Sequence, residues 1–439
     1  MAQTWQLAEV VVLRPEAFGG MAFHRKRGIT LEIDQDAYDF LCTCLAPGPL
    51  PSADHPAAHL VPQLVRLGFL QPTSRVVTPE GTSTQALWAG DGTTLSAPET
   101  VHVAITTRCN LFCPGCYVPR REGNSELAIA DWCDLIAQWA QMRVFQVAVG
   151  GGEPLLYDGL FEVLAYARQQ GLVPNLTTNG TLLDRDAVRH LQHAGVARVN
   201  VSWNSPGGDN WGRNQAASRA LRLLLDSTME VGVNLLVTPA LLPRLPQVLA
   251  RLQALGIRRV TVLRPKPPAI PSDANTAWYD SNRLRRADLL RLRAVLNAWQ
   301  RALALEVDSA LVGLMGDADP ARLRWRAIHG CTAGRRICTV WSDGRVTPCS
   351  FLGDLETGNV CQTLFVELWK QGRNWELLRD PSARPQGSCT GCAVALYCGG
   401  ARCTARYEKS NASTTCIQGE LNTGLLVGDV ECPHHREAT

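Results

Sequence analysis

Three cysteines in one short segment constrain this chain more than any other feature. Cys109, Cys113 and Cys116 are separated by three residues and then by two, so a single loop can hold all three thiols. Three thiolates that bind one four-iron cluster leave one iron without a protein ligand, and an open iron can bind a small molecule. The spacing therefore indicates a reactive iron–sulfur cluster rather than a purely structural one.

This C-x3-C-x2-C loop, followed by the aromatic residue Tyr117, resembles the cluster loop of the radical S-adenosylmethionine (SAM) enzymes. The resemblance implies that SAM chelates the open iron of a [4Fe-4S] cluster, and that an electron from the cluster cleaves SAM to a 5′-deoxyadenosyl radical. A second motif, with Gly151, Gly152 and Glu153, resembles the GGE motif that holds the methionine end of SAM in this family. Glycines let backbone groups approach a ligand closely, and a carboxylate accepts hydrogen bonds from an ammonium group.

Strands and helices alternate along residues 99–310, the predicted catalytic domain. We expect buried strands at 101–106, 144–149, 173–177, 199–202, 233–237 and 259–263, and helices that include 160–170, 184–194, 216–231 and 246–255. Such alternation predicts an α/β fold with a parallel sheet and with ligands at the carboxyl ends of the strands. It fits the partial (β/α)6, TIM-like barrel that the resemblance implies.

Polar residues at strand ends are the candidates for further SAM contacts. They are Thr178, Asn179, Ser202, Asn204 and Arg264, and for each the alternative is a polar residue whose hydrogen bonds are satisfied locally. By the resemblance, Tyr117 presents its backbone to the adenine. The family often has an acidic residue after the fourth strand's serine, whereas this chain has Trp203 and Asn204, so the ribose contacts stay open.

A second group of cysteines occupies residues 325–439. Its members with ligand-like spacing are Cys331, Cys338, Cys349, Cys389, Cys392, Cys398, Cys403 and Cys432. The pattern resembles the SPASM extension of radical SAM peptide-modifying enzymes, which carries two auxiliary iron–sulfur clusters. The resemblance implies one cluster on Cys331, Cys349 and Cys403, with Cys338 as a plausible fourth ligand. It implies a second on Cys389, Cys392, Cys398 and a late cysteine, for which Cys432 is preferred to Cys416.

Zinc is the alternative metal for this region. Cys389-x2-Cys392 with a second cysteine pair downstream has the spacing of a zinc ribbon. The four residues between Cys398 and Cys403, one more than the family usually has, require a bulged loop. The cluster loop and the segment from Cys331 to Cys349 favour iron–sulfur clusters.

Residues 1–92 predict a small winged-helix-like domain, followed by a linker at 71–98. Strands are expected at 10–13, 21–24 and 29–33, and helices at 34–45 and 60–70. The arrangement resembles the PqqD-like element that binds leader peptides of ribosomally made precursors. If so, the leader adds as a strand to the edge of the sheet. The alternative is a structural cap.

Composition excludes several other classes of protein. The chain has 439 residues, 46% of them hydrophobic, and a net charge of only +3, which argues against nucleic-acid or membrane binding by bulk charge. It has no apolar run that could span a bilayer and no signal peptide at its start, so we expect a cytoplasmic protein. Sixteen cysteines in such a chain favour metal ligands over disulfides.

These resemblances together cover nearly the whole chain and predict a radical SAM/SPASM enzyme that modifies a ribosomally synthesised precursor peptide. An oxidative crosslink, thioether or carbon–carbon, is favoured because auxiliary clusters can accept an electron, and a flavodoxin or ferredoxin would supply the reducing electron. Epimerisation, backbone excision, sulfatase-type maturation and small-molecule dehydrogenation stay open as alternatives. A zinc-binding interaction protein is the non-enzymatic alternative. No side chain stands out as a general base.

Overall fold

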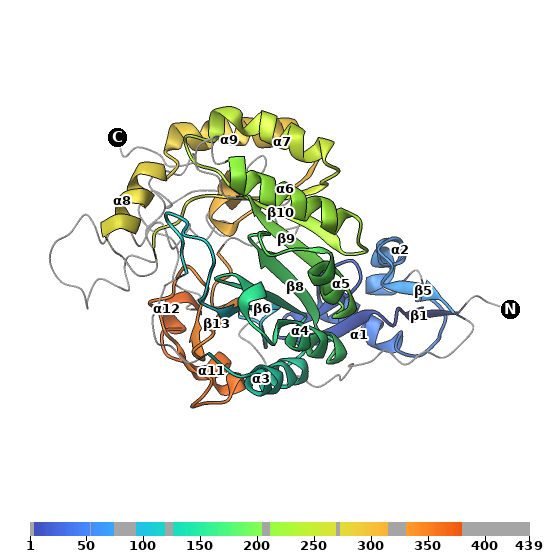
Figure 1. Cartoon of the computed structure of the whole chain (residues 1–439). Coiled ribbons are helices and arrows are strands. Elements are labelled where there is room, and N and C mark those ends of the chain that lie inside the picture. The colour runs from blue at the N-terminus through green and yellow to red at the C-terminus, as the bar shows by residue number, and fades with distance from the viewer. Residues whose placement is uncertain are drawn as a thin grey trace, which may run out of the picture.

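One ten-stranded sheet forms the centre of the molecule. The computed structural model describes residues 4–52, 54–73, 94–118, 126–203, 211–268, 273–314 and 331–379 (Figure 1). Six consecutive strands of the sheet are parallel and neighbour one another in sequence order, as expected for a partial barrel. They are β6 (Thr100–Thr106), β7 (Gln146–Gly151), β8 (Val173–Thr178), β9 (Arg198–Trp203), β10 (Glu230–Leu236) and β11 (Arg259–Leu263).

The sheet extends beyond these six strands at both edges. Strand β12 (Ala304–Val307) adds in parallel to β11. At the other edge, β13 (Ile337–Trp341) adds in parallel to β6, and β14 (Arg345–Thr347) and β15 (Gly358–Asn359) follow antiparallel. The second cysteine region therefore continues the sheet of the barrel, which its sequence did not predict.

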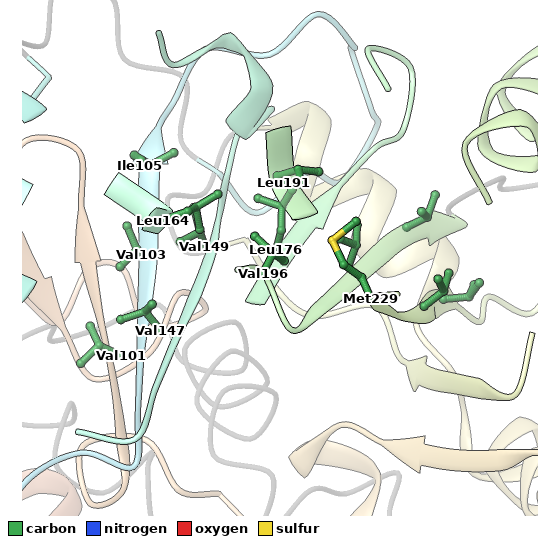
Figure 2. Close-up of a cluster of buried hydrophobic side chains, with 14 of the residues drawn as sticks. Val101, Val103, Ile105, Val147, Val149, Leu164, Leu176, Leu191, Val196 and Met229 are labelled. Atoms are coloured by element: carbon green, nitrogen blue, oxygen red, sulfur yellow. The ribbon is translucent and has the colours of Figure 1, made fainter. Parts of the chain in front are cut away.

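Helices cover one face of the parallel strands (Figure 1). They are α3 (Ile129–Gln141), α4 (Leu160–Gln169), α5 (Arg185–His193), α6 (Trp211–Leu225), α7 (Leu245–Ala254) and α9 (Arg286–Trp299). Helix α8 (Asp273–Asn282) lies away from these strands in Figure 1, and short 3-10 turns occur at Pro154–Leu156, Leu242–Arg244 and Ser309–Leu314. Alternate residues of β6 and β7 pack on this side, as Val103 and Val149 do near Leu164 in Figure 2. Burial of each such side chain stabilises the fold by about 1.5–3 kcal/mol.

Two helices end several residues earlier than the sequence predicted. Helix α6 ends at Leu225, because the Ser227 hydroxyl donates to the Leu224 carbonyl at 2.6 Å and turns the chain into β10. Helix α2 (Val61–Arg66) ends before Gly68, whose φ of 76° is in the left-handed region that glycine adopts without strain. Strand β5 (Leu70–Pro72) then pairs with β1 (Trp5–Leu7).

The N-terminal unit contains the three expected strands. Strands β2 (Val11–Glu16), β3 (Gly19–His24) and β4 (Ile29–Ile33) form an antiparallel sheet with β3 in the middle. Helix α1 (Gln35–Thr43) has Asp34 as its N-cap, and the Asp34 side chain accepts a hydrogen bond from the Ala37 amide. The 3-10 turn Pro56–Leu60 precedes α2.

This unit packs tightly on the barrel. Arg14 is buried, donates hydrogen bonds to the carbonyls of Pro98 and Arg143 at 3.0 and 2.9 Å, and lies over the ring of Phe145. Leu95, in the expected linker, is buried with Phe23 and Phe145. The end of the linker is therefore part of the core between the two units.

The described part of the second cysteine region ends with two helices, α11 (Phe365–Gln371) and α12 (Glu376–Arg379). The Phe365 ring contacts Trp139 of α3, and Trp369 donates a hydrogen bond to the Leu95 carbonyl at 3.1 Å. No helix in the described ranges is long and apolar enough to cross a membrane.

Candidate active site

The cysteine loop follows the carboxyl end of β6, where the strand alternation places ligands. Cys109 and Cys113 are half-buried, Cys116 is exposed, and none of the three forms a disulfide. The Cys109 sulfur accepts the Leu111 amide at 3.4 Å. Beside the loop, Glu126 accepts a hydrogen bond from Thr106 and pairs with Arg108 at 3.0 Å.

The glycine motif packs against the first residues of this loop. The Gly152 amide donates to the Thr106 carbonyl at 2.7 Å, and the Glu153 amide donates to the Arg108 carbonyl at 2.8 Å. A Cβ on Gly151 would lie 2.4 Å from the Thr106 oxygen, and one on Gly152 would lie 2.0 Å from the Arg108 oxygen. The close approach that requires glycine is thus to the backbone of the cluster loop.

The Glu153 carboxylate is fully buried behind the motif. Its Oε1 accepts hydrogen bonds from the Thr178 hydroxyl at 2.7 Å and the Leu155 amide at 3.3 Å, and its Oε2 accepts the Asn179 amide at 2.8 Å. Burial raises the pKa of Glu153, while these three hydrogen bonds act in the opposite direction.

Asn179 connects this carboxylate to the cysteine loop. Its side-chain nitrogen lies 3.9 Å from the Cys109 sulfur and donates to Asn110 at 3.0 Å. Its side-chain oxygen accepts the Thr181 amide at 2.9 Å, and Asn110 donates to the Thr181 hydroxyl at 2.8 Å. The ends of β6, β7 and β8 are therefore held together by polar contacts around Cys109.

The other side of the cysteine loop is covered by an indole ring. Gly115, between Cys113 and Cys116, has a φ of 68°, and a Cβ there would lie 1.9 Å from the ring of Trp278 on α8. Sequence reasoning did not find Trp278, because α8 belongs to no motif and lies far along the chain from the loop.

Tyr117 joins the cysteine loop to the second cysteine region. Its ring lies 4.6 Å from the ring of Phe351, two residues after Cys349. The Lys266 ammonium sits 3.9 Å over the Phe351 ring and 3.5 Å from the Asp308 carboxylate. Burial raises the pKa of Tyr117 to about 12, and negative charge on the sulfurs of Cys116 and Cys349 acts in the same direction.

The remaining SAM candidates lie on different strands. Thr178 ends β8, and its hydroxyl contacts Glu153. Ser202 is half-buried on β9, and Arg264 is buried just after β11, with its amide donating to Asp308 at 3.1 Å. Asn204 lies outside the described residues.

Three of the predicted ligands in the second region are described. Cys331 and Cys349 pack in one small cluster with Leu352, Leu355 and Leu378. Cys338 instead lies in β13, fully buried in the main core, and this burial raises the pKa of its thiol. The other predicted ligands lie outside the described residues: Cys389, Cys392, Cys398, Cys403 and Cys432.

The loop has the donor chemistry of an iron–sulfur site. Within the described ranges, no three His, Cys, Asp or Glu side chains meet closely enough to hold a single metal ion. A four-iron cluster is different, because each cysteine binds a different iron and the sulfurs stay apart. Cys109, Cys113 and Cys116 on one loop, with an amide hydrogen bond to the first sulfur, fit such a cluster.

Two family models match the chain. The model described as the radical SAM superfamily matches residues 103–240, and the SPASM model, described as an iron–sulfur cluster-binding domain, matches residues 331–393. The first contains the cysteine loop and the glycine motif, and the second contains Cys331, Cys338, Cys349, Cys389 and Cys392.

Curated relatives align with most of the chain. The PqqA peptide cyclase of Gluconobacter oxydans is 29% identical over 335 residues, which cover 73% of this chain and 90% of the relative. The AdoMet-dependent heme synthase of Oleidesulfovibrio alaskensis is 25% identical over 333 residues, covering 68% and 81%.

Solved structures share the fold. SuiB of Streptococcus suis bound to its precursor peptide SuiA superposes with a TM-score of 0.69 at 18% identity, covering 98% of this chain and 99% of SuiB. The enzyme anSMEcpe with bound AdoMet gives a TM-score of 0.57 at 18% identity, covering 77% and 91%. The likeness to SuiB extends over nearly the whole chain.

Proposed function

Since this chain belongs to the radical SAM superfamily and carries a SPASM iron–sulfur cluster-binding domain, we propose that it forms an oxidative crosslink in a ribosomally synthesised precursor peptide. The names of its relatives support this substrate class: one is a PqqA peptide cyclase, and SuiB has been crystallised with its precursor peptide.

Cys109, Cys113 and Cys116 would hold the [4Fe-4S] cluster, which with bound SAM would supply the radical chemistry of the reaction. The chain's own residues hold and shield this site. Gly151 and Gly152 bring the end of β7 against the cysteine loop, and Trp278 covers the loop at Gly115.

One observation carries the preference for an oxidative reaction. The two cysteine regions touch, because β13 pairs with β6 and leads to the hairpin before Cys349, and because Phe351 contacts Tyr117. A crosslink removes two hydrogens from the peptide, one as a hydrogen atom to the radical and one as a proton, and leaves one electron. An auxiliary cluster next to the reacting site is a suitable acceptor for that electron.

The N-terminal unit is proposed to bind the leader of the precursor. The three-stranded sheet of this unit has β2 and β4 as its edge strands. The residues of β4 are less buried than those of β2, so β4 is the more accessible edge. An edge strand offers unpaired backbone groups to an extended peptide. A flavodoxin or ferredoxin is proposed as the electron donor, in line with the low potential that cleavage of SAM requires.

The test is an anaerobic assay with synthetic peptides encoded by short reading frames beside the gene. With SAM and dithionite, the reconstituted protein should form 5′-deoxyadenosine and a peptide with two hydrogens fewer, whose tandem mass spectrum shows the link. A product of unchanged mass with D-residues would instead identify an epimerase, and loss of a backbone fragment would identify an excision enzyme.

Small-molecule dehydrogenation or sulfatase-type maturation is the second candidate, because this fold also occurs in anSMEcpe, whose structure has been solved with bound AdoMet and a Cp18Cys peptide. Conversion of a small alcohol or a short cysteine peptide without any leader would support it. A colourless protein that contains zinc and does not cleave SAM would contradict the enzymatic proposal as a whole.

A further inference from the structure

The Glu153 carboxylate connects the glycine motif to Thr178 and Asn179 at the end of β8, an arrangement that we call the clamp. The GGE resemblance suggests that its carboxylate faces the ammonium group of SAM, yet the side chain has no exposed surface. Both oxygens are occupied by the protein: Thr178 and Leu155 donate to Oε1, and the Asn179 amide donates to Oε2. These three donors take the place of water around the buried carboxylate.

The turn that Glu153 holds is the one that reaches the cluster loop. Thr178 and Asn179 are consecutive residues at the end of β8, and both are bound to the carboxylate. The Thr181 amide donates to the Asn179 side-chain oxygen, which turns the Asn179 side-chain nitrogen toward Cys109 and Asn110. The position of this nitrogen therefore depends on the turn, and the turn depends on Glu153.

A role in binding SAM through the carboxylate would break this arrangement. The Glu153 side chain has no exposed surface, so an ammonium could reach its carboxylate only if the turn moved away, with loss of hydrogen bonds to a charged group that contribute about 1.5–3 kcal/mol each. Moving the turn would also move the side-chain nitrogen of Asn179 away from the Cys109 sulfur. These two atoms are 3.9 Å apart in this structure. Hydrogen bonds to cysteine sulfurs orient the ligand and tune the potential of an iron–sulfur cluster.

We propose that Glu153 is a positioning residue, which holds the Thr178–Asn179 turn against Cys109 and does not contact the ammonium group of SAM. This inference rests on the proposed function only in taking Cys109 as a ligand of the radical-generating cluster. It assigns the recognition of the SAM ammonium to groups other than this carboxylate.

Two substitutions distinguish a positioning role of Glu153 from a direct contact with SAM. Glu153→Gln keeps the shape of the side chain but places an amide donor opposite a backbone donor, either Asn179 or Leu155. Thr178→Val has the shape of threonine and removes only the hydroxyl, which donates to Glu153 and accepts the Gly180 amide at 3.0 Å. Thr178→Val changes nothing on Glu153 itself, and because Thr178 is buried with its hydroxyl bound to Glu153 and Gly180, we expect the substitution to affect SAM through the turn and not as a lost SAM contact. Glu162→Gln, on the exposed side of α4, is the matched control.

The first measurement uses the metal-free protein without peptide. Iodoacetamide labelling of Cys109, followed by mass spectrometry, should be roughly three- to tenfold faster in Glu153→Gln and in Thr178→Val, since each loses a hydrogen bond worth about 1 kcal/mol. The double variant should be no faster than the faster single one, because both act on the same contact. Glu162→Gln should match the parent protein.

The second measurement is SAM binding to the reconstituted protein by calorimetry. The clamp predicts that both variants weaken SAM binding by a similar factor. The inference is overturned if Glu153→Gln weakens SAM binding while Thr178→Val matches the parent, or if Cys109 labels at the parent rate in Thr178→Val. Should Glu153→Gln fail to fold, Thr178→Val decides alone. Neither measurement needs a substrate, so both stand even if no precursor peptide is converted.

Discussion

At the scale of single residues, backbone space around the cysteine loop decides which side chains the site tolerates. A Cβ on Gly151 would collide with the backbone oxygen of Thr106, and one on Gly152 with that of Arg108. A Cβ on Gly115 would collide with the ring of Trp278. Each glycine therefore allows a contact that fixes the loop.

Gly115→Ala should block assembly of the cluster. The new Cβ would lie 1.9 Å from Trp278, and its φ of 68° costs roughly 1–2 kcal/mol for a residue with a Cβ. Iron content after anaerobic reconstitution measures the effect. Gly28→Ala is the matched control, because Gly28 has a φ of 62° and no atom near its Cβ position. If Gly115→Ala/Trp278→Ala stays as low in iron as Gly115→Ala, the clash with Trp278 is not the cause.

Cys338→Ala should keep all the iron of the protein, whereas Cys331→Ala and Cys349→Ala should each lose iron. Cys338 is buried in the main core, and burial raises the pKa of its thiol, which disfavours the thiolate that a metal needs. Its replacement should cost about 1 kcal/mol of stability through lost packing. Iron and sulfide analysis of the three variants is the measurement, and loss of iron in Cys338→Ala would make this residue the fourth ligand.

At the scale of elements, the proposed function depends on two strands, β13 of the ten-stranded sheet and β4 of the N-terminal sheet. Strand β13 pairs with β6 from Ile337 against Thr100 to Trp341 against Ala104, and this ladder sets where Cys349 lies relative to the cysteine loop. Strand β4 is the accessible edge of the N-terminal sheet.

Proline substitutions in β4 should abolish leader binding. In a strand, the amides of consecutive residues point to opposite sides. One of the two substitutions, Thr30→Pro or Leu31→Pro, therefore removes only an amide at the free edge of the sheet. That variant should fold, by circular dichroism, and lose binding of a labelled leader peptide by at least about tenfold, as measured by fluorescence anisotropy. Thr30→Ala and Leu31→Ala are the controls. Unchanged binding in the proline variant that folds would place the leader elsewhere.

At the scale of the whole molecule, Arg336 joins three parts of the chain. It precedes β13, and its guanidinium pairs with Glu32 of β4 at 2.5 Å and with Glu99, just before β6, at 2.6 Å. With 11% of its side chain exposed, it fixes the N-terminal sheet, the barrel and the second cysteine region together.

Arg336→Gln should lower the free energy of unfolding by about 2 kcal/mol, because it leaves two partly buried carboxylates without the guanidinium that pairs with both. Arg373→Gln breaks the exposed pair with Glu356 and should cost less than about 1 kcal/mol. Urea denaturation monitored by tryptophan fluorescence compares the two. Equal effects would mean that Arg336 is no better shielded from solvent than Arg373.

Because the N-terminal unit packs against the barrel, deletion of residues 1–92 is not a suitable test of leader binding. The deletion would expose Phe145 and Leu95, which are buried against Phe23. It would also remove Arg14 from its contacts with Pro98 and Arg143. Loss of activity after the deletion would then report unfolding, so the substitutions in β4 are the better experiment.

The sequence by itself determined the chemistry and the local elements. Cysteine spacing and a glycine motif are local patterns, and strands that alternate with helices have distinct periodicities, so the loop at Cys109 and strands β6 to β11 were predicted. Only the tertiary structure decided which distant residues meet. Trp278 on Gly115, Phe351 on Tyr117 and the addition of β13 to β6 join segments far apart in the chain. Such contacts depend on packing, which leaves no periodic signal in the sequence.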